Sequence, residues 1–269
     1  MHRLVSLVAA CGALASQALA QSTPTPQVVA SFYGPMPTGV SVSHKGRVFV
    51  NFPRWGDKVP YTVAEVKNGK TVPYPDLAHN QPDQRDIFNH LISVQSIMVD
   101  PKDRLWILDT GSIKFGPTRY GGPKLLGVNL ATNKVFKAIY FPRTVVPSTS
   151  YLNDVRFDLQ RGTGGMAFIT DSGEHGPNGI VVVDLATGKS WRRLAFDPSV
   201  RGEPRFLPIV EGQPLKNRPK NAPTSYLKLG SDGIAMSQDG RRLFYCPLSS
   251  RRLYSVSIDA LLDQKRTNA

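Results

Sequence analysis

The chain has 269 residues, of which 41% are hydrophobic and 20% are charged, and it contains 23 glycines and 22 prolines. These proportions exclude a wholly disordered chain and a collagen-like repeat, and the length is sufficient for one large hydrophobic core. The formal net charge of +13 is compatible with the binding of acidic partners.

The first 20 residues have the pattern of a secretory signal peptide. Arg3 precedes an apolar stretch over 4–14, and the small-residue motif at 18–20 lies directly before Gln21. The apolar stretch is shorter than the roughly 20 residues that a membrane span requires. We therefore predict a secreted protein that begins at Gln21 after cleavage, with an N-terminal extension over 21–30 and no membrane span.

A repeated pattern follows along the chain. Each copy consists of a short apolar strand, a polar turn and a second apolar strand, which is the pattern of a β-hairpin. The four copies occupy 38–50, 95–109, 153–171 and 232–246. A second hairpin signal follows the first three copies, at 66–70, 128–134 and 183–189. Two hairpins make four strands, which is one blade of a β-propeller, so the sequence predicts an all-β fold.

The spacing of the copies indicates an insertion and an incomplete ring. The copies begin 57, 58 and 79 residues apart, and the surplus lies in a proline-rich insert over 197–226 with no strand or helix pattern. Blades are expected over 31–260 and a polar tail over 261–269, with only the beginning of a second hairpin in the fourth unit. About four blades are therefore present. Either they form a small closed ring, or a larger propeller lacks its C-terminal part and has unpaired strand edges.

Five short segments, in this order, resemble the yellow / major royal jelly protein family: 46–55, 105–111, 151–155, 170–173 and 231–235. The resemblance implies a secreted, six-bladed propeller, of which about two C-terminal blades are missing here. It also implies a function such as dopachrome-type tautomerisation or the binding of small amines in the central cavity. A non-catalytic or truncated, defective family member is an alternative.

Four polar residues occupy the same position in the four copies: Thr38, Gln95, Asn153 and Asp232. The first strand of each propeller blade lines the central channel, so these side chains are expected to converge at one mouth and to bind a ligand. The alternative is that they only cap turns. Two acidic residues are candidates for proton transfer, and hence for catalysis: Asp232 itself and Asp154, which directly follows Asn153.

The leading functional prediction is a protein that binds a small aromatic or amine-like molecule. If the protein is an enzyme, it is predicted to isomerise, tautomerise or cyclise this molecule without a cofactor. The alternative is a metal-dependent, lactonase-like hydrolase, because the Asn153–Asp154 pair resembles the gluconolactonase-type propellers. Asn153 and Asp232 could supply two oxygen ligands to Ca²⁺ or another divalent cation. The matching position in the first unit is Thr38 rather than glutamate, which weighs against such a metal site.

The remaining motifs give predictions of partners and of structural roles. Basic clusters at 216–220, 241–242 and 251–252 match no nucleic-acid motif, and they favour attraction to acidic glycans or a cell surface instead. Asp109 and Asp171 each end a strand before a glycine-containing turn, where hydrogen bonding to the turn is expected. Four residues in apolar strands are expected in the core: Cys246, Trp55, Trp106 and Trp191.

Overall fold

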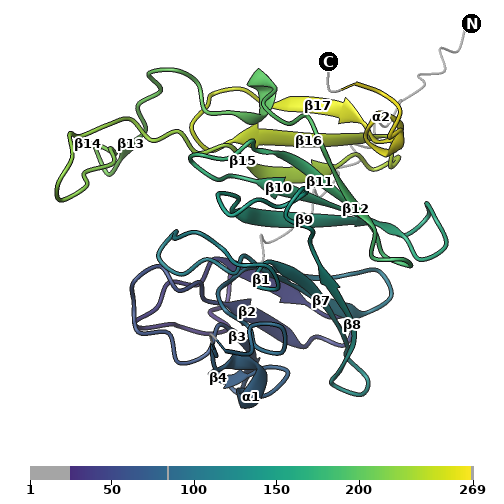
Figure 1. Ribbon diagram of the computed structural model, residues 1–269. Coiled ribbons are helices and arrows are strands. Elements are labelled where there is room, and N and C mark those ends of the chain that lie inside the picture. The colour runs from purple at the N-terminus through teal and green to yellow at the C-terminus, as the bar shows by residue number, and fades with distance from the viewer. Residues whose placement is uncertain (1–24, 84, 268–269) are drawn as a thin grey trace, which may run out of the picture.

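The fold of the chain is that of a β-propeller segment (Figure 1). A computed structural model describes residues 25–83 and 85–267, so the predicted signal peptide and the cleavage position at Gln21 lie outside the described residues. Successive stretches of the chain form successive antiparallel sheets. No helix of the described residues is long and apolar enough to cross a membrane.

The first two blades are regular four-stranded sheets in which each strand pairs with the next along the chain. Blade 1 contains β1 (Gly39–Val42), β2 (Val48–Asn51), β3 (Val63–Lys67) and β4 (Lys70–Pro73). A single helical turn, α1 (Leu77–Asn80), leads into blade 2, which contains β5 (Val94–Val99), β6 (Arg104–Asp109), β7 (Lys124–Asn129) and β8 (Lys134–Tyr140).

The last two blades differ in their strand number. Blade 3 contains β9 (Leu152–Asp158), β10 (Met166–Asp171), β11 (Gly179–Asp184) and β12 (Ser190–Arg193). Blade 4 has three strands, β15 (Ser231–Met236), β16 (Arg242–Pro247) and β17 (Tyr254–Ser257), and the chain then turns into helix α2 (Ile258–Leu262). The expected beginning of a second hairpin in the fourth unit is therefore the single strand β17, and the residues that follow it form a helix.

Local sequence explains the hairpins. Asn68 and Gly69 connect β3 to β4 with φ angles of 51° and 73°. Positive φ at both central residues is typical of the type I′ turn, whose twist matches that of the flanking strands and which Asn-Gly favours. The strands at the centre of blade 3, β10 and β11, are buried almost throughout because other blades cover both faces of the sheet.

The hydrophobic core lies between successive blades. One cluster joins blades 1 and 2 through residues such as Phe49 and Leu105, and a second joins blades 2 and 3 through Leu125 and Ile169. A third joins blades 3 and 4. Within residues 25–83 and 85–267, no core cluster joins blade 4 to blade 1, and these blades lie at opposite ends of the molecule (Figure 1). The described blades are thus an open arc, not a closed four-bladed ring.

The proline-rich insert contains short regular elements that the sequence analysis did not predict. They are the 3₁₀ turn η1 (Pro198–Val200) and a two-residue hairpin formed by β13 (Ile209–Val210) and β14 (Gln213–Pro214). Strands of two residues are too short to produce an alternating pattern, which explains why the segment read as a structureless loop.

Of the four residues expected in the core, one is buried and three are half-buried. Trp106 is buried between blades, but Trp55 and Trp191 are half-buried, and so is the free thiol of Cys246. Cys246 lies on β16 next to Tyr245, which belongs to the core cluster between blades 3 and 4. Because successive side chains of a strand point to opposite faces, Cys246 faces away from that core.

Candidate functional site

The four polar residues of the repeat lie at equivalent places on the innermost strands. Gln95, Asn153 and Asp232 are the second residues of β5, β9 and β15, and Thr38 directly precedes β1. These innermost strands are neighbours: β1 packs against β5, β5 against β9, and β9 against β15. We refer to Thr38, Gln95, Asn153 and Asp232 together as the polar column.

Three of the four column residues lie at β-bulges. Val94 and Ser96 pair with consecutive residues of β6, which leaves Gln95 as the additional residue. The same shift leaves Asp232 without a partner between Ser231 and Gly233 of β15. In β9 the register shifts between Leu152 and Val155, the segment that holds Asn153. A bulge redirects a side chain out of the regular alternation and is common beside functional sites.

Hydrogen bonds connect the column from blade to blade. The Thr38 hydroxyl donates to the Gln95 backbone oxygen at 3.1 Å and accepts from Asn51 Nδ2 at 2.8 Å. The Tyr151 hydroxyl donates to Gln95 Oε1 at 2.9 Å. The Thr170 hydroxyl donates to the Asp232 backbone oxygen at 2.9 Å. These bonds hold the strand starts of the four blades in a defined arrangement.

The carboxyl group of Asp232 is the ionisable group among the four column residues. Burial raises its pKa to about 6; the Asn153 amide opposes this rise and the negative charge of Asp154 adds to it. A carboxyl group with such a pKa exchanges a proton close to neutral pH, as general acid–base catalysis requires.

Asp154 has a different environment. Its Oδ1 accepts a hydrogen bond from the Ser96 hydroxyl at 2.7 Å, and its Oδ2 pairs with the Arg156 guanidinium at 2.9 Å. The structure therefore places Asp154 between blades 2 and 3 with both oxygens engaged. Its contribution at the column is the negative charge that acts on Asp232.

Three aromatic residues that the sequence analysis did not assign to the site lie beside the column. The Trp55 and Phe115 rings stack with centroids 5.5 Å apart, and the Phe115 and Tyr151 rings lie 5.3 Å apart. Trp55 Nε1 donates to the Tyr151 hydroxyl at 2.7 Å. Burial raises the pKa of Tyr151, so its phenol remains a hydrogen-bond donor. The one sequence signal for Tyr151 is its place three positions before Asp154, in the 151–155 segment.

Phe115 lies on a loop with an unusual backbone. Phe115 and the preceding Lys114 both have left-handed conformations, with φ of 57° and 52°, and the Phe115 side chain is 59% exposed. Left-handed φ is rare for bulky residues. The Lys114 N–H donates to the Arg54 backbone oxygen at 2.9 Å, which ties this loop to the segment that carries Trp55.

Asp109 and Asp171 support the segments that lead into the inner strands. Asp109 accepts the N–H groups of Ser93 and Gly111, both at 2.9 Å. Asp171 accepts the N–H groups of Tyr151 at 2.9 Å and Gly173 at 3.1 Å. The expected hydrogen bonds to the following turns are thus present. Each carboxylate also holds the backbone just before the column residue of its own blade.

Both supporting carboxylates are neutralised by buried cations. Lys124 Nζ lies 3.1 Å from Asp109 Oδ2, and both side chains are fully buried. Arg192 lies 2.8 Å from Asp171 Oδ2 in a similarly enclosed position. Two ion pairs in equivalent blades therefore stabilise the framework behind the column.

The donor set for a metal ion is small. Within the described ranges 25–83 and 85–267, no group of three or more His, Cys, Asp or Glu side chains is placed to hold a metal ion. Asn153 and Asp232 could offer two oxygen ligands, whereas Ca²⁺ takes 6–8.

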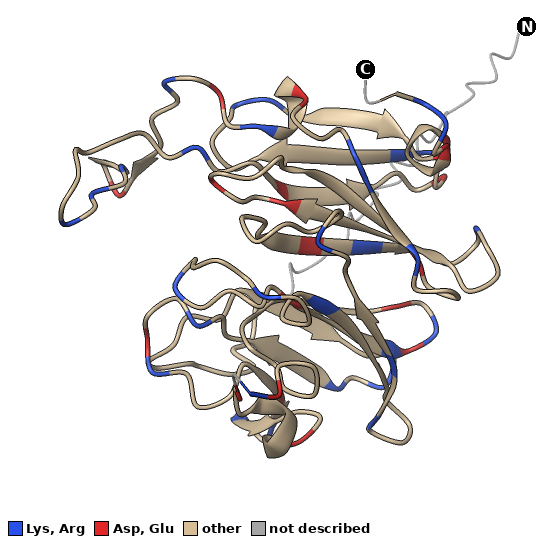
Figure 2. Ribbon diagram, viewed as in Figure 1, with Lys and Arg blue, Asp and Glu red and all other residues tan. Residues whose placement is uncertain are grey.

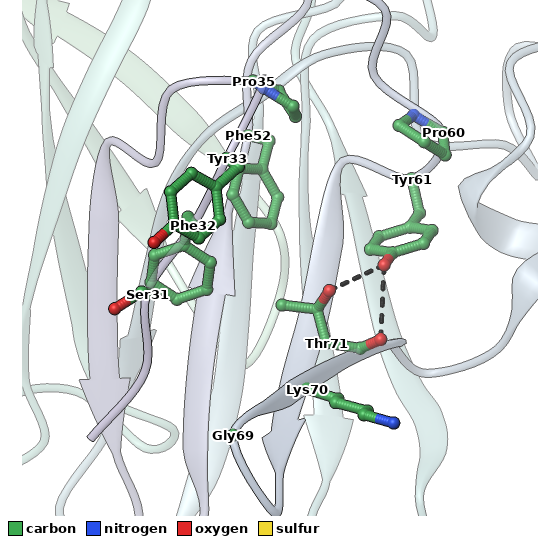
Figure 3. Close-up of a pocket in the computed structure, with 10 residues that line it drawn as sticks. All are labelled: Ser31, Phe32, Tyr33, Pro35, Phe52, Pro60, Tyr61, Gly69, Lys70 and Thr71. Carbon is green, nitrogen blue, oxygen red and sulfur yellow. Dashed lines mark hydrogen bonds between the residues drawn. The ribbon is translucent and has the colours of Figure 1, made fainter. Parts of the chain in front are cut away.

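One hollow of blade 1 lies apart from the column. It has a volume of about 330 Å³, and Figure 3 shows Phe32 and Tyr33 on one side and Tyr61 and Thr71 on the other. The Tyr61 hydroxyl is hydrogen-bonded to Thr71. None of the four column residues lines this hollow. A second hollow, of about 580 Å³, lies over β1 and touches the column only at Thr38.

Comparison with protein families gives a match to the family described as "Major royal jelly protein", over residues 92–269. Among curated proteins, "Protein yellow" of Drosophila madeirensis is 29% identical over 245 residues, covering 85% of this chain and 40% of its own length. "Protein yellow" of Drosophila melanogaster is 28% identical over 273 residues, covering 94% of this chain and 46% of its own length. The chain thus spans less than half the length of these relatives.

Solved structures resemble the chain in fold. The hydrazine synthase of Kuenenia stuttgartiensis matches with a TM-score of 0.50 and 15% identity, over 86% of this chain and 56% of the other. A periplasmic gluconolactonase of Pseudomonas aeruginosa matches with a TM-score of 0.45 and 18% identity, over 85% of this chain and 55% of the other. Similarity at these identities concerns the fold alone.

Proposed function

Because this chain belongs to the major royal jelly protein family, we propose that it is a secreted protein that binds a small aromatic or amine-like molecule at the polar column and isomerises or tautomerises it there. The proposal rests mainly on Asp232, which lies at a β-bulge and whose pKa of about 6 suits it to proton transfer. The rings of Trp55, Phe115 and Tyr151 supply aromatic surface nearby.

Each group has a defined part in this proposal. The ionised Asp232 carboxylate attracts the ammonium group of an amine, or removes a proton from an acidic position of the ligand. The protonated form then returns a proton to a second position, so that tautomerisation is balanced without an oxidant or a cofactor. Gln95 and Asn153 orient the ligand through hydrogen bonds, and Asp154 favours the protonated form of Asp232 through its charge.

A thermal melting screen of the purified protein tests this proposal. A ligand that binds only the folded state raises the melting temperature, and the rise grows with the ratio of the free ligand concentration to the Kd. We expect catecholamines to raise it and Ca²⁺, Zn²⁺ and sugar lactones to leave it unchanged. Stabilisation by a divalent cation, with lactone hydrolysis that chelation abolishes, would instead establish the hydrolase alternative. No response to any of these compounds would favour a non-catalytic role.

Tyr151→Phe is expected to weaken catecholamine binding about fivefold to tenfold. The substitution removes the hydroxyl that donates to Gln95 and accepts from Trp55, so Gln95 is no longer fixed in position to orient the ligand. A typical hydrogen bond contributes about 1 kcal/mol, which sets the size of the expected loss. The measurement is a binding titration by tryptophan fluorescence or calorimetry.

Tyr61→Phe is the matched control for that titration. It also removes a tyrosine hydroxyl with a hydrogen bond, to Thr71, but in the blade 1 hollow that contains no column residue. We expect it to leave the affinity unchanged. Equal affinities of Tyr151→Phe and the unmodified protein would separate Tyr151 from the site.

A further inference from the structure

The proline-rich insert forms an arm that projects from blade 4 (Figure 1). We define the arm as residues 204–228. Its root is attached to the loop after β16: the Glu203 N–H donates to the Ser249 oxygen at 2.8 Å, and the Ser250 hydroxyl donates to Glu203 Oε1 at 2.9 Å. The Arg251 guanidinium lies over the Phe206 ring, 4.8 Å from its centroid. The base of the arm therefore has a defined position on the propeller.

Short ladders of backbone hydrogen bonds shape the arm. β13 and β14 pair through a turn at Glu211 and Gly212, which both have positive φ. Farther along, Asn217 and Ser225 exchange two backbone hydrogen bonds of 3.0 Å each. Most side chains of the arm are exposed, and none belongs to a core cluster. The arm is a hydrogen-bonded ribbon that belongs to none of the core clusters of the described residues.

The arm carries an excess of positive charge (Figure 2). Its only acidic residue is Glu211, whereas its basic residues are Arg205, Lys216, Arg218, Lys220 and Lys228. None of these five forms an ion pair with another residue in the described part of the chain. Many arginines of the blades, by contrast, are paired, as Arg47 is with Glu65 and Arg104 with Asp100. The cations of the arm are thus free to meet an external anion.

The ladder places two of the cations on one side of the ribbon. Asn217 is paired with Ser225, so the residues on either side of Asn217, Lys216 and Arg218, project to the opposite face from Asn217. Lys216 Nζ lies over the Tyr226 ring, 5.5 Å from its centroid. Lys216 and Arg218 thus share one face of the ribbon, and the exposed Lys220 follows two positions farther along the chain. This clustering of cations suits a polymer with repeated negative charges.

From this arrangement we propose that the arm is a docking element for an anionic polysaccharide. The unpaired cations provide charge complementarity along an extended ribbon, where each contact with an anion releases counterions. The chemistry of the tip argues against insertion into a membrane, because Glu211 lies in the turn beside Ile209 and Val210 and would have to be desolvated with them. The proposal is independent of the ligand at the polar column.

The test is binding of the full chain to immobilised heparin, a sulfated polysaccharide, at increasing salt concentrations. The triple variant Lys216→Gln, Arg218→Gln, Lys220→Gln is expected to bind at least about tenfold more weakly at 0.15 M salt and to show a smaller salt dependence. Arg218 and Lys220 are exposed, Lys216 is half-buried, and none of the three belongs to a core cluster. The melting temperature and the catecholamine response of the variant should therefore be unchanged, which distinguishes this result from failure of the proposed function.

A charge-matched control separates the arm from the net charge of the whole protein. Lys45→Gln, Lys102→Gln, Lys134→Gln removes three exposed lysines from blades 1 and 2 and changes the net charge equally. We expect this control to retain nearly full heparin affinity. Equal losses in both triple variants would overturn the proposal by showing that only net charge matters. Binding to phosphatidylserine vesicles but not to heparin would overturn it in favour of a membrane surface.

Discussion

Replacing Asp109 by asparagine is expected to lower the free energy of unfolding by about 3–5 kcal/mol, because it leaves the Lys124 ammonium group buried without a counter-charge. Both side chains are fully buried, and Asp109 also accepts the Ser93 and Gly111 N–H groups. Burying an isolated charge is far more unfavourable than burying a compensated pair. Urea denaturation followed by tryptophan fluorescence measures the change.

Two further variants give this prediction its controls. Asp109→Asn combined with Lys124→Met removes both charges, so it is expected to recover much of the stability that the single variant loses. Asp83→Asn breaks an exposed pair with Arg85 and should leave the denaturation midpoint unchanged. A single Asp109→Asn variant as stable as the unmodified protein would mean that the pair does not support the blade.

Asp232→Asn is expected to weaken the binding of a cationic amine by at least about tenfold while raising stability at neutral pH. The lost affinity reflects the loss of a charge-assisted hydrogen bond, worth roughly 1.5–3 kcal/mol. Stability rises because burial disfavours the ionised carboxylate, and asparagine removes that charge. Calorimetric titration and thermal melting of the same sample measure the two effects.

The sign of the pH dependence follows from the raised pKa. The pKa of Asp232 is about 6 in the folded chain and 3.8 for an unperturbed carboxyl group, so the folded state holds the proton over this interval. Its favourable contribution is therefore complete below pH 4 and is lost as the pH rises through 6, by up to about 3 kcal/mol. The stabilisation by Asp232→Asn should accordingly be large at pH 7 and absent at pH 4.

The same titration affects ligand binding in the opposite direction. Below pH 6 the carboxyl group becomes neutral and attracts an ammonium group less strongly, so the affinity for a catecholamine should fall in the unmodified protein. Asp232→Asn should show no such fall. An Asp232→Asn variant with unchanged affinity and a lower melting temperature at pH 7 would instead identify Asp232 as a turn-capping residue.

The sequence by itself determined the blades. Apolar alternation, polar turns and the Asn68-Gly69 signal act between residues close in the chain, so the β1–β2 and β3–β4 hairpins and the four-strand units can be recognised without tertiary information. The repeat also placed Gln95, Asn153 and Asp232 at equivalent positions of the inner strands. Equivalent positions in a repeated unit occupy equivalent places in space, which is why this alignment needed no structure.

Only the tertiary structure decided what surrounds those positions. Packing between strands and blades brings together segments that are separated in the chain. It produces the bulge at Asp232, the approach of Trp55 to Tyr151 and the burial of Lys124 beside Asp109. The pKa of Asp232 likewise depends on burial, which exists only once the blades assemble. Local sequence patterns do not predict such contacts, because the dielectric environment and the counter-charges around a residue are properties of the folded chain.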